Sequence, residues 1–369
     1  MGASKSDILL IGGGHSHVGV LADWARRGCP ARRATLLTPE PTLRYSGMVP
    51  GWLAGEHTRD AGLVDLAGLA RAAGVDLVLD RCVAIDPESR TILSLGNGVV
   101  PFDLASIDVG GVPHAARVLG DDPRLLDIRP IDRFVAELER KEQLARSIAV
   151  IGGGAGGVEI AFALRQRAGG PKPVSVTLIA GERGLLPDFS SQVRRKVVAE
   201  LARQGIAFFA VDAWMERGVL LAGEVETPAD LVVAAIGSAA PDWPRAGGLA
   251  VDEEGFIAVD RHQRSTSHPY IFAAGDCARR IDAKVAHSGV HAVHTGRVLA
   301  ANLRAASKGK PPRRSYRPRP ASLYLLSTGT GEAILSYGPF AVQSRWAARL
   351  KAWIDKRWIA TYAAMTERA

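Results

Sequence analysis

Two stretches, DILLIGGGHSHV at residues 7–18 and SIAVIGGGAGGV at residues 147–158, decide the fold of this chain. Each is a short apolar run followed by three glycines and the start of a helix-compatible segment. A second apolar run follows each helix, at residues 34–37 and 174–179. A strand, a glycine turn, a helix and a second strand form the βαβ unit that binds dinucleotides. Because the pattern occurs twice, we predict an α/β fold with two Rossmann-like dinucleotide-binding domains.

The glycines of each turn have separate physical roles. The first permits the tight turn, the second lets the backbone approach a pyrophosphate, and the third lets the helix pack close to the strand. The pyrophosphate then lies at the helix N-terminus, where free N–H groups and the helix dipole favour an anion. The second turn is complete, whereas His17 stands where the third glycine of the first turn belongs. The cofactor-binding residues predicted at the two turns are Gly12, Gly14, His15, Ser16, His17, Gly152, Gly154 and Gly157.

An acidic residue that binds the adenosine ribose is expected after the second strand of each unit. The first of these strands ends at Thr38, which we include in the cofactor site, and Glu40 comes two residues later. The second ends at Ala180 and is followed by Glu182 and Arg183. An arginine here can accept the 2′-phosphate of NADPH. The sequence therefore leaves the choice between NADH and NADPH open.

The composition is that of a globular protein of 369 residues with a net charge of +8. No apolar run reaches the roughly 18–20 residues that cross a bilayer, and no signal peptide precedes the first strand. The three cysteines form no CxxC pair, so no structural metal site is predicted. No nucleic-acid-binding module is recognised either. We predict a cytoplasmic protein.

Further motifs bring a family resemblance. Residues 267–276, SHPYIFAAGD, form an apolar run that ends in Gly275 and Asp276, and the stretches 103–113 and 230–241 are apolar runs that end near glycines. In this order the motifs resemble the FAD-dependent pyridine nucleotide-disulfide oxidoreductase superfamily. The resemblance implies that Asp276 binds the FAD ribityl chain, that Val83 contacts the adenine and that Glu159 orients the nicotinamide. It adds Asp108, Gly110, Gly237 and Gly275 to the predicted cofactor-binding residues.

A closer resemblance covers nearly the whole chain. GGGHSHVGVL (12–21), YSGMVPGWLAGEHT (45–58), LYLLSTG (323–329) and WIDKRW (353–358) are similar to the oxidoreductase module fused ahead of selenide, water dikinase. That module in turn resembles type II NADH:quinone oxidoreductases. The chain departs from these relatives at Thr295, where they carry a glutamine, and this weakens the argument for a quinone acceptor.

The cysteine content decides the kind of flavoenzyme that the resemblance implies. Disulfide reductases of the superfamily need a cysteine pair soon after the first βαβ unit, and residues 41–51 contain no cysteine. We therefore predict an FAD-dependent NAD(P)H oxidoreductase that passes a hydride from nicotinamide to flavin and then electrons to a quinone or similar small acceptor. Ser46, Gly47 and Met48 are expected beside the flavin ring. The alternative is a flavin-binding accessory or redox-sensing protein of selenium metabolism without fast turnover.

Three histidines, His287, His291 and His294, recur at helical spacing. A metal site is disfavoured because no acidic or thiol ligand accompanies them. They are either partly exposed polar residues or groups that deliver protons to a bound acceptor, since an imidazole titrates near about 6.5. On the second interpretation, His291 and His294 join Glu159 as predicted catalytic residues.

The C-terminal part is basic and aromatic. Residues 308–320, KGKPPRRSYRPRP, carry six positive charges and no acid, as a solvated linker does. In residues 343–365, five apolar side chains recur at helical spacing among basic ones: Trp346, Leu350, Trp353, Ile354 and Trp358. Such a helix suits an anionic membrane surface on the inner face of the cell membrane. The same pattern also suits packing on a partner chain, as in a homodimer, or on the body of the protein.

The predicted domain organisation follows from the order of these motifs. Residues 1–108 and 242–330 form a discontinuous FAD-binding domain, and residues 109–241 form the NAD(P)-binding domain inserted in it. Residues 331–369 form a C-terminal segment with an amphipathic basic helix.

Overall fold

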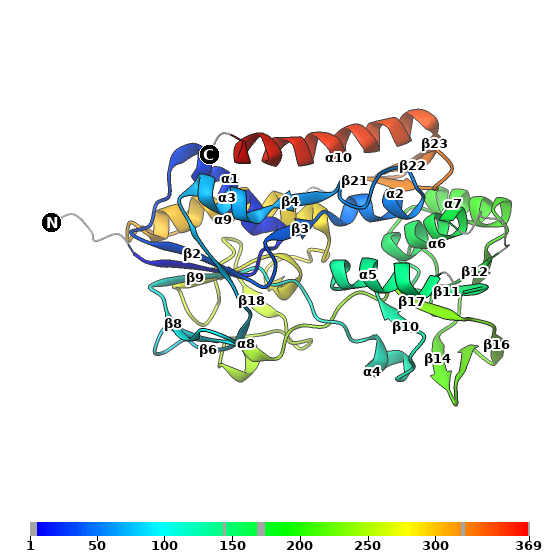
Figure 1. Cartoon of the computed structure of the whole chain (residues 1–369), viewed down its shortest axis with the longest axis horizontal. Helices are drawn as coiled ribbons and strands as arrows, with labels where there is room; N and C mark the ends of the chain where they lie inside the picture. Colours follow the sequence, from blue (N-terminus) through cyan, green and yellow to red (C-terminus); the bar gives the residue numbers. More distant parts are fainter. Residues whose placement is uncertain (1–5, 143–144, 168–173, 319–321, 368–369) are drawn as a thin grey trace.

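The computed structural model describes residues 6–142, 145–167, 174–318 and 322–367. Its core is two five-stranded sheets in which all neighbouring strands are parallel, and each sheet lies in its own half of the molecule (Figure 1). The first sheet has, in spatial order, β19 (Ile271–Ala273), β9 (Leu104–Ile107), β1 (Ile8–Ile11), β2 (Ala34–Thr38) and β5 (Asp76–Leu79). The second has β10 (Leu125–Asp127), β17 (Leu231–Ala234), β11 (Ser147–Ile151), β12 (Ser175–Ile179) and β13 (Ala207–Phe209).

All strands of the second sheet fall between β9 and β19 of the first in the sequence. The predicted fold class, two Rossmann-like units with one inserted in the other, is therefore confirmed. Both glycine turns lie where expected, between β1 and α1 (His15–Arg27) and between β11 and α6 (Ala155–Arg167).

The alternating side chains of the first sheet pack on two different layers. Ile8 and Leu10 face α1, α3 (Leu66–Ala73) and α9 (Gly289–Ala306). Leu9 and Ile11 face β6 (Cys82–Asp86), β7 (Thr91–Ser94), β8 (Gly98–Pro101), β18 (Ile257–Val259) and β20 (Ala278–Arg280).

Helices α1 and α9 touch at two glycines. A Cβ built on Gly19 would lie 3.1 Å from the Gly296 Cα, so the two backbones are in direct contact. The N-terminal ends of these helices are thereby fixed relative to each other.

The second sheet is also covered on both faces. One face packs on α5 (Ile131–Lys141), α6 and α7 (Ser191–Arg203). The other packs on α4 (Ala115–Leu119) and on the sheet of β14 (Ala213–Glu216), β15 (Val219–Ala222) and β16 (Val225–Thr227). A hairpin of β3 (Thr42–Arg44) and β4 (Leu63–Asp65) carries η1 (Ser46–Met48) and α2 (Val49–Leu53) between its strands, and α2 buries Trp52 and Leu53 in the core of the second unit. The remaining short helices are α8 (Trp243–Ala246) and η3 (Gly275–Cys277).

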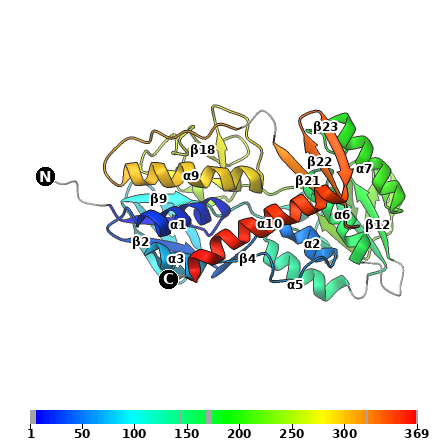
Figure 2. The same cartoon turned by 90° about the horizontal axis from the view of Figure 1, so that it is seen from above.

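The C-terminal part forms a small sheet and one long helix. The sheet consists of β21 (Leu323–Ser327), β22 (Ala333–Tyr337) and β23 (Phe340–Ser344), so the domain boundary predicted at residue 330 falls inside it. Helix α10 (Arg345–Thr366) starts at this sheet and runs across the molecule to α3 (Figure 2). Within the described ranges, no helix is both long and apolar enough to span a bilayer.

Helix α10 has an exposed side and a side that packs on the body of the protein. Trp346 and Trp353 are exposed, at 52% and 58% of their surface. Trp358 instead stacks on Tyr45, with ring centroids 4.3 Å apart. Of the alternatives that the sequence left open for this helix, packing on the body of the protein therefore holds for its inner side.

Candidate functional site

The first glycine turn encloses a buried carboxyl group. Asp108, at the end of β9, is 2% exposed and accepts hydrogen bonds from the backbone N–H groups of Ser16 (2.8 Å) and His17 (3.0 Å). A Cβ on Gly14 or Gly275 would overlap the Asp108 carboxyl, so a side chain at either position would displace this group, and Gly275 also has a positive φ of +70°. Burial raises the pKa of Asp108 to about 7; the two N–H donors oppose this rise and the Asp276 carboxylate adds to it.

This carboxyl decides whether the turn fits the pyrophosphate of FAD. An ionised carboxylate at the start of α1 repels a second anion, whereas a protonated one adds no charge and can donate a hydrogen bond. The raised pKa keeps much of the group protonated near neutral pH. The residues at this turn therefore fit the pyrophosphate of FAD when Asp108 is protonated.

His17 fills the place of the missing third glycine. Its side chain is fully buried, with Nδ1 2.6 Å from the Gly12 carbonyl oxygen and Nε2 2.8 Å from the Ser106 hydroxyl. Burial lowers the pKa of His17 to about 4, so the imidazole is neutral at neutral pH. The histidine thus joins the turn to β9 by two hydrogen bonds.

The second turn has the geometry that its glycines predict. Gly152 has a φ of +130°, and a Cβ on Gly157 would overlap the Gly152 carbonyl oxygen. Gly154 has open space where a Cβ would lie, and it faces a cavity. The helix and the turn are therefore close together while the front of the turn stays accessible.

The large cavity between the two sheets, called here the interdomain cavity, has a volume of about 830 Å³. The second glycine turn, Glu159, Arg183 and Gly237 line it from the inserted unit. Ser46 and Gly47, together with Ser288 and Gly289 at the start of α9, line it from the first unit. The C-terminal part supplies Leu323–Leu326, Lys351, Ile354 and Asp355. A cavity of this size holds a drug-sized ligand or larger.

Glu159 is a buried carboxylate at the wall of this cavity. Its Oε1 accepts a hydrogen bond from the Ser327 backbone N–H (2.9 Å) and lies 3.8 Å from Lys351 Nζ. Burial raises the pKa of Glu159, and the Lys351 ammonium opposes this rise. Lys351 and Asp355 are not among the residues predicted from the sequence, because the charges of this helix were expected on its outer surface.

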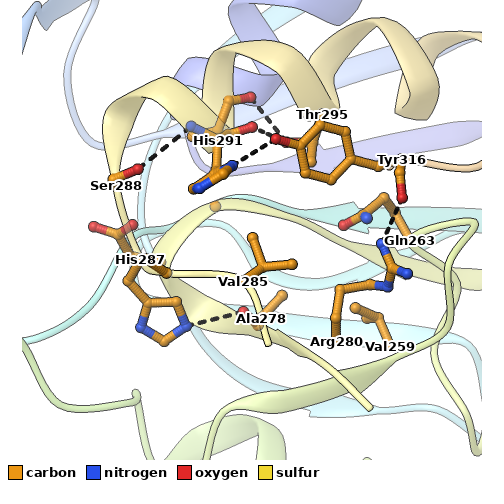
Figure 3. A pocket seen from close by; sticks show the side chains of 14 residues that line it. Val259, Gln263, Ala278, Arg280, Val285, His287, Ser288, His291, Thr295 and Tyr316 are labelled. Carbon is orange, nitrogen blue, oxygen red and sulfur yellow. Dashed lines mark hydrogen bonds between the residues drawn. The ribbon is translucent and has the colours of Figure 1, made fainter. Parts of the chain in front are cut away.

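The three histidines do not lie on one helix face. His287 precedes α9, which is capped by Ser288, and its Nε2 lies 3.1 Å from the Ala278 carbonyl oxygen. His291 Nδ1 lies 2.5 Å from the Tyr316 hydroxyl, and Figure 3 shows these two side chains pointing toward each other. Burial lowers the pKa of both His287 and His291. His294 is exposed.

His287 and His291 line a small polar pocket of about 30 Å³ with Gln263 and Arg280 (Figure 3). The Gln263 Nε2 is buried without a hydrogen-bond partner, and the space admits about two water molecules. Within the residues that the structure describes, no group of three His, Cys, Asp or Glu side chains is placed to hold a metal ion.

The other predicted residues lie on several different elements. Thr38 is buried at the end of β2 beside Gly13, whereas Val83 on β6 is 37% exposed. Gly110 and Gly237 have φ angles of +69° and +90° in the segments that connect the two units. Asp276 forms an ion pair of 2.9 Å with Arg129. Met48 is buried behind Ser46 and Gly47.

Thr295 does not reach the interdomain cavity. It is buried, and its hydroxyl lies 3.0 Å from the Ser16 hydroxyl, so it joins α9 to α1. It also lines the small polar pocket.

Comparisons with known proteins agree with this architecture. A family model described as "Pyridine nucleotide-disulphide oxidoreductase" matches residues 6–296. Dihydrolipoyl dehydrogenase of Vibrio cholerae is 28% identical over 250 residues, which are 62% of this chain and 48% of that protein. The chain thus spans about half the length of that relative. Ferroptosis suppressor protein 1 of Homo sapiens is 25% identical over 279 residues, 70% of this chain and 71% of that protein.

Among solved structures, the sulfide:quinone oxidoreductase of Aquifex aeolicus superposes with a TM-score of 0.78. The superposition covers 97% of this chain and 92% of that structure at 17% sequence identity. At this identity the likeness shows the fold.

Proposed function

Since the chain belongs to the pyridine nucleotide-disulphide oxidoreductase family, whose members are FAD- and NAD(P)H-dependent oxidoreductases, we propose that it oxidises NADH or NADPH and reduces a quinone or similar small acceptor. When bound, FAD supplies the two-electron carrier between the nicotinamide and the acceptor. The chain itself binds the two dinucleotides, orients their rings and excludes water from between them.

The interdomain cavity is the observation that carries this proposal. The second glycine turn opens into it from the inserted unit, and the Ser46–Gly47 segment and the start of α9 reach it from the first unit. Two dinucleotides bound at the two turns would both extend toward this cavity. Its 830 Å³ suffice for two ring systems in contact.

The state of the cysteines supports transfer to an external acceptor and not to an internal disulfide. None of the three cysteines forms a disulfide, and none lines the interdomain cavity. Burial raises the pKa of both Cys277 and Cys82, the latter to about 12, so neither thiol ionises readily. A thiolate is the form needed for disulfide exchange.

The apolar wall of the cavity supports a quinone-like acceptor. Ile131, Phe134, Val290, Leu325 and Ile354 line it, and an apolar wall suits an aromatic ring or an isoprenoid chain. The Aquifex aeolicus structure with the same fold is named a sulfide:quinone oxidoreductase.

The outer face of α10 supports contact with the surface of an anionic membrane, and quinones dissolve in the interior of such a membrane. Trp346 and Trp353 are exposed there, one heptad apart, and Arg349 and Lys356 are exposed beside them. Tryptophan and basic side chains together favour the headgroup layer. The double variant Trp346→Ser/Trp353→Ser should no longer sediment with phosphatidylserine vesicles. Retained sedimentation would contradict this part of the proposal.

The central experiment is an anaerobic titration of the FAD-loaded protein. We expect NADH or NADPH to bleach the flavin absorbance, and a soluble quinone to restore it within one turnover. The two donors, tested separately, decide the nucleotide preference. Bleaching that persists with every quinone tested would contradict the proposal and favour the accessory or redox-sensing role. If neither NADH nor NADPH bleaches the flavin, the proposal is contradicted entirely.

A further inference from the structure

Helix α10 brings a buried charged cluster to the wall of the interdomain cavity. Lys351 and Asp355 lie one turn apart on the inner side of the helix, with 16% and 10% of their side chains exposed. Their charged groups are 3.4 Å apart, and Lys351 Nζ lies 3.8 Å from Glu159 Oε1 of α6. All three residues line the cavity.

Docking of α10 on the body of the protein does not require these charges. Burying an ammonium and two carboxylates costs desolvation energy, which apolar residues of similar size avoid. The same side of the helix uses apolar or aromatic residues elsewhere, such as Ala347, Trp358 and Ile359. The charged residues occur only on the part of this inner side that faces the cavity. Their position therefore points to a role in the cavity.

Lys351 connects three separate parts of the chain. Its Nζ donates a hydrogen bond of 3.0 Å to the Gly47 carbonyl oxygen, which belongs to the first unit. It is paired with Glu159 of the inserted unit and with Asp355 of its own helix. Burial alone would lower the pKa of Lys351, but these two carboxylates raise it above the ordinary value, so the group is an ammonium at neutral pH.

The neighbouring aromatic residues hold this arrangement in place. Tyr45, two residues before Gly47, stacks on Trp358 with an interplanar angle of 20°, and its hydroxyl shares the Asp355 carboxylate with Lys351. On the other side, the Ser327 N–H fixes Glu159. The ammonium therefore has defined partners on both the flavin side and the nicotinamide side of the cavity.

We propose that Lys351 is a positioning residue of the hydride-transfer site, by which the C-terminal helix fixes Glu159 and the Gly47 carbonyl in the geometry that receives the nicotinamide. This inference rests on the proposed function. Without the ammonium, Glu159 and Asp355 face each other as two buried carboxylates with no cation between them, and their repulsion turns them apart. The Gly47 segment also loses its link to α10.

The test compares Lys351→Met with Lys356→Met, an exposed lysine on the outer side of the same helix. Each protein is loaded with FAD and titrated with NAD⁺, which binds without transferring a hydride, and the midpoint potential of the bound flavin is measured. We expect Lys351→Met to raise the dissociation constant for NAD⁺ by about tenfold, the factor that loss of one charge-assisted hydrogen bond gives. The midpoint potential should become more negative because a positive charge is lost. Lys356→Met should change neither quantity.

Two further variants keep the test decisive if Lys351→Met does not fold. Lys351→Arg retains the charge, and its dissociation constant for NAD⁺ should lie within about threefold of the wild-type value. Glu159→Gln removes the carboxylate that pairs with Lys351, and its dissociation constant should rise about tenfold. Where all variants fold, Lys351→Met should add little to Glu159→Gln, because the two residues act as one unit.

Unchanged NAD⁺ affinity and an unchanged flavin potential in Lys351→Met would overturn this inference. A fall in the thermal stability of that variant would not rescue it, because the lysine would then only stabilise the packing of α10. Unchanged NAD⁺ affinity in Glu159→Gln would overturn it too. If the wild-type protein loaded with FAD binds no NAD⁺, the proposed function fails as well. If the wild type binds NAD⁺ and Lys351→Met has the same affinity and midpoint potential, only this inference is refuted and the proposed function stands.

Discussion

Replacing Asp108 by asparagine should stabilise the protein at alkaline pH and leave its stability nearly unchanged only below the ordinary aspartate pKa of 3.8. Burial raises the pKa of this carboxyl from 3.8 to about 7. The folded state therefore binds more protons than the unfolded state between these values, and stability falls as the pH rises through this window. Asparagine has nearly the same shape, and its amide oxygen can still accept from Ser16 and His17.

The size of the effect follows from the width of the window. Each pH unit between the two pKa values changes the free energy of unfolding by about 1.4 kcal/mol. From pH 5 to pH 8 the wild type therefore loses roughly 3 kcal/mol through this group, and the loss levels off about one pH unit above the folded-state pKa. Asparagine does not titrate, so the free energy of unfolding of the variant does not change through this group. The difference in the free energy of unfolding between variant and wild type should therefore grow by roughly 3 kcal/mol between pH 5 and pH 8.

Urea unfolding of the FAD-free protein at pH 5 and pH 8 measures this difference. Trp24 is fully buried in the core of the first unit and contributes a fluorescence signal for its unfolding. The matched control is Asp103→Asn, which removes an exposed carboxylate one residue before β9. An equal difference between wild type and Asp108→Asn at the two pH values would refute the reasoning. In parallel, FAD should bind the wild type more weakly above pH 7, and the variant equally at both pH values.

Three further predictions concern the rest of the site. Gly157→Ala should abolish NAD⁺ binding or destabilise the inserted unit by several kcal/mol, because its Cβ overlaps a backbone carbonyl; normal calorimetric titration and a normal unfolding curve would contradict it. Arg183→Ala should raise the KM for NADPH about tenfold and leave that for NADH unchanged, since the arginine lines the cavity just after β12; equal effects on both would exclude 2′-phosphate recognition. The pKa of His291 is lowered from 6.5 by burial and by His294, so His291→Ala should remove an inflection of the pH–rate profile below pH 6.5. An unchanged profile would exclude His291 from proton delivery.

The two glycine turns could be predicted from the sequence because their requirements are local. Gly152 needs a positive φ, and Gly157 needs room beside the carbonyl of its own turn. Both constraints act within a few residues and leave a visible pattern. The strand on each side of a turn is likewise set by a short apolar run, so the parallel sheets follow.

Lys351 and Asp355 could not be predicted, because their role depends on where α10 lies. A lysine and an aspartate four residues apart are usually a solvent-exposed pair on a helix. Only the packing of this helix on α3 and on the C-terminal sheet turns the pair inward. Trp358 also depends on where the helix packs. Its helical spacing groups it with Trp353, but Trp353 is exposed and Trp358 stacks on Tyr45.

His287 illustrates the uncertainty of helix boundaries. Its spacing from His291 fits a helix, but Ser288 caps α9 by accepting a hydrogen bond from the His291 N–H, and the helix starts after it. A serine at this point is a strong N-cap signal. That signal could have separated His287 from the helical pair.

The glycine contact between α1 and α9 has a consequence for how the protein tolerates change. One of these helices begins beneath the predicted phosphates of FAD, and the other begins beside its predicted ring. Gly19 and Gly296 pack backbone to backbone, and a Cβ on Gly296 would lie 2.7 Å from the Ser16 carbonyl oxygen. A side chain at residue 296 would therefore push α9 away from α1 and shift the start of one helix relative to the other. A single methyl group at this contact would thus affect binding of both the phosphates and the ring of FAD.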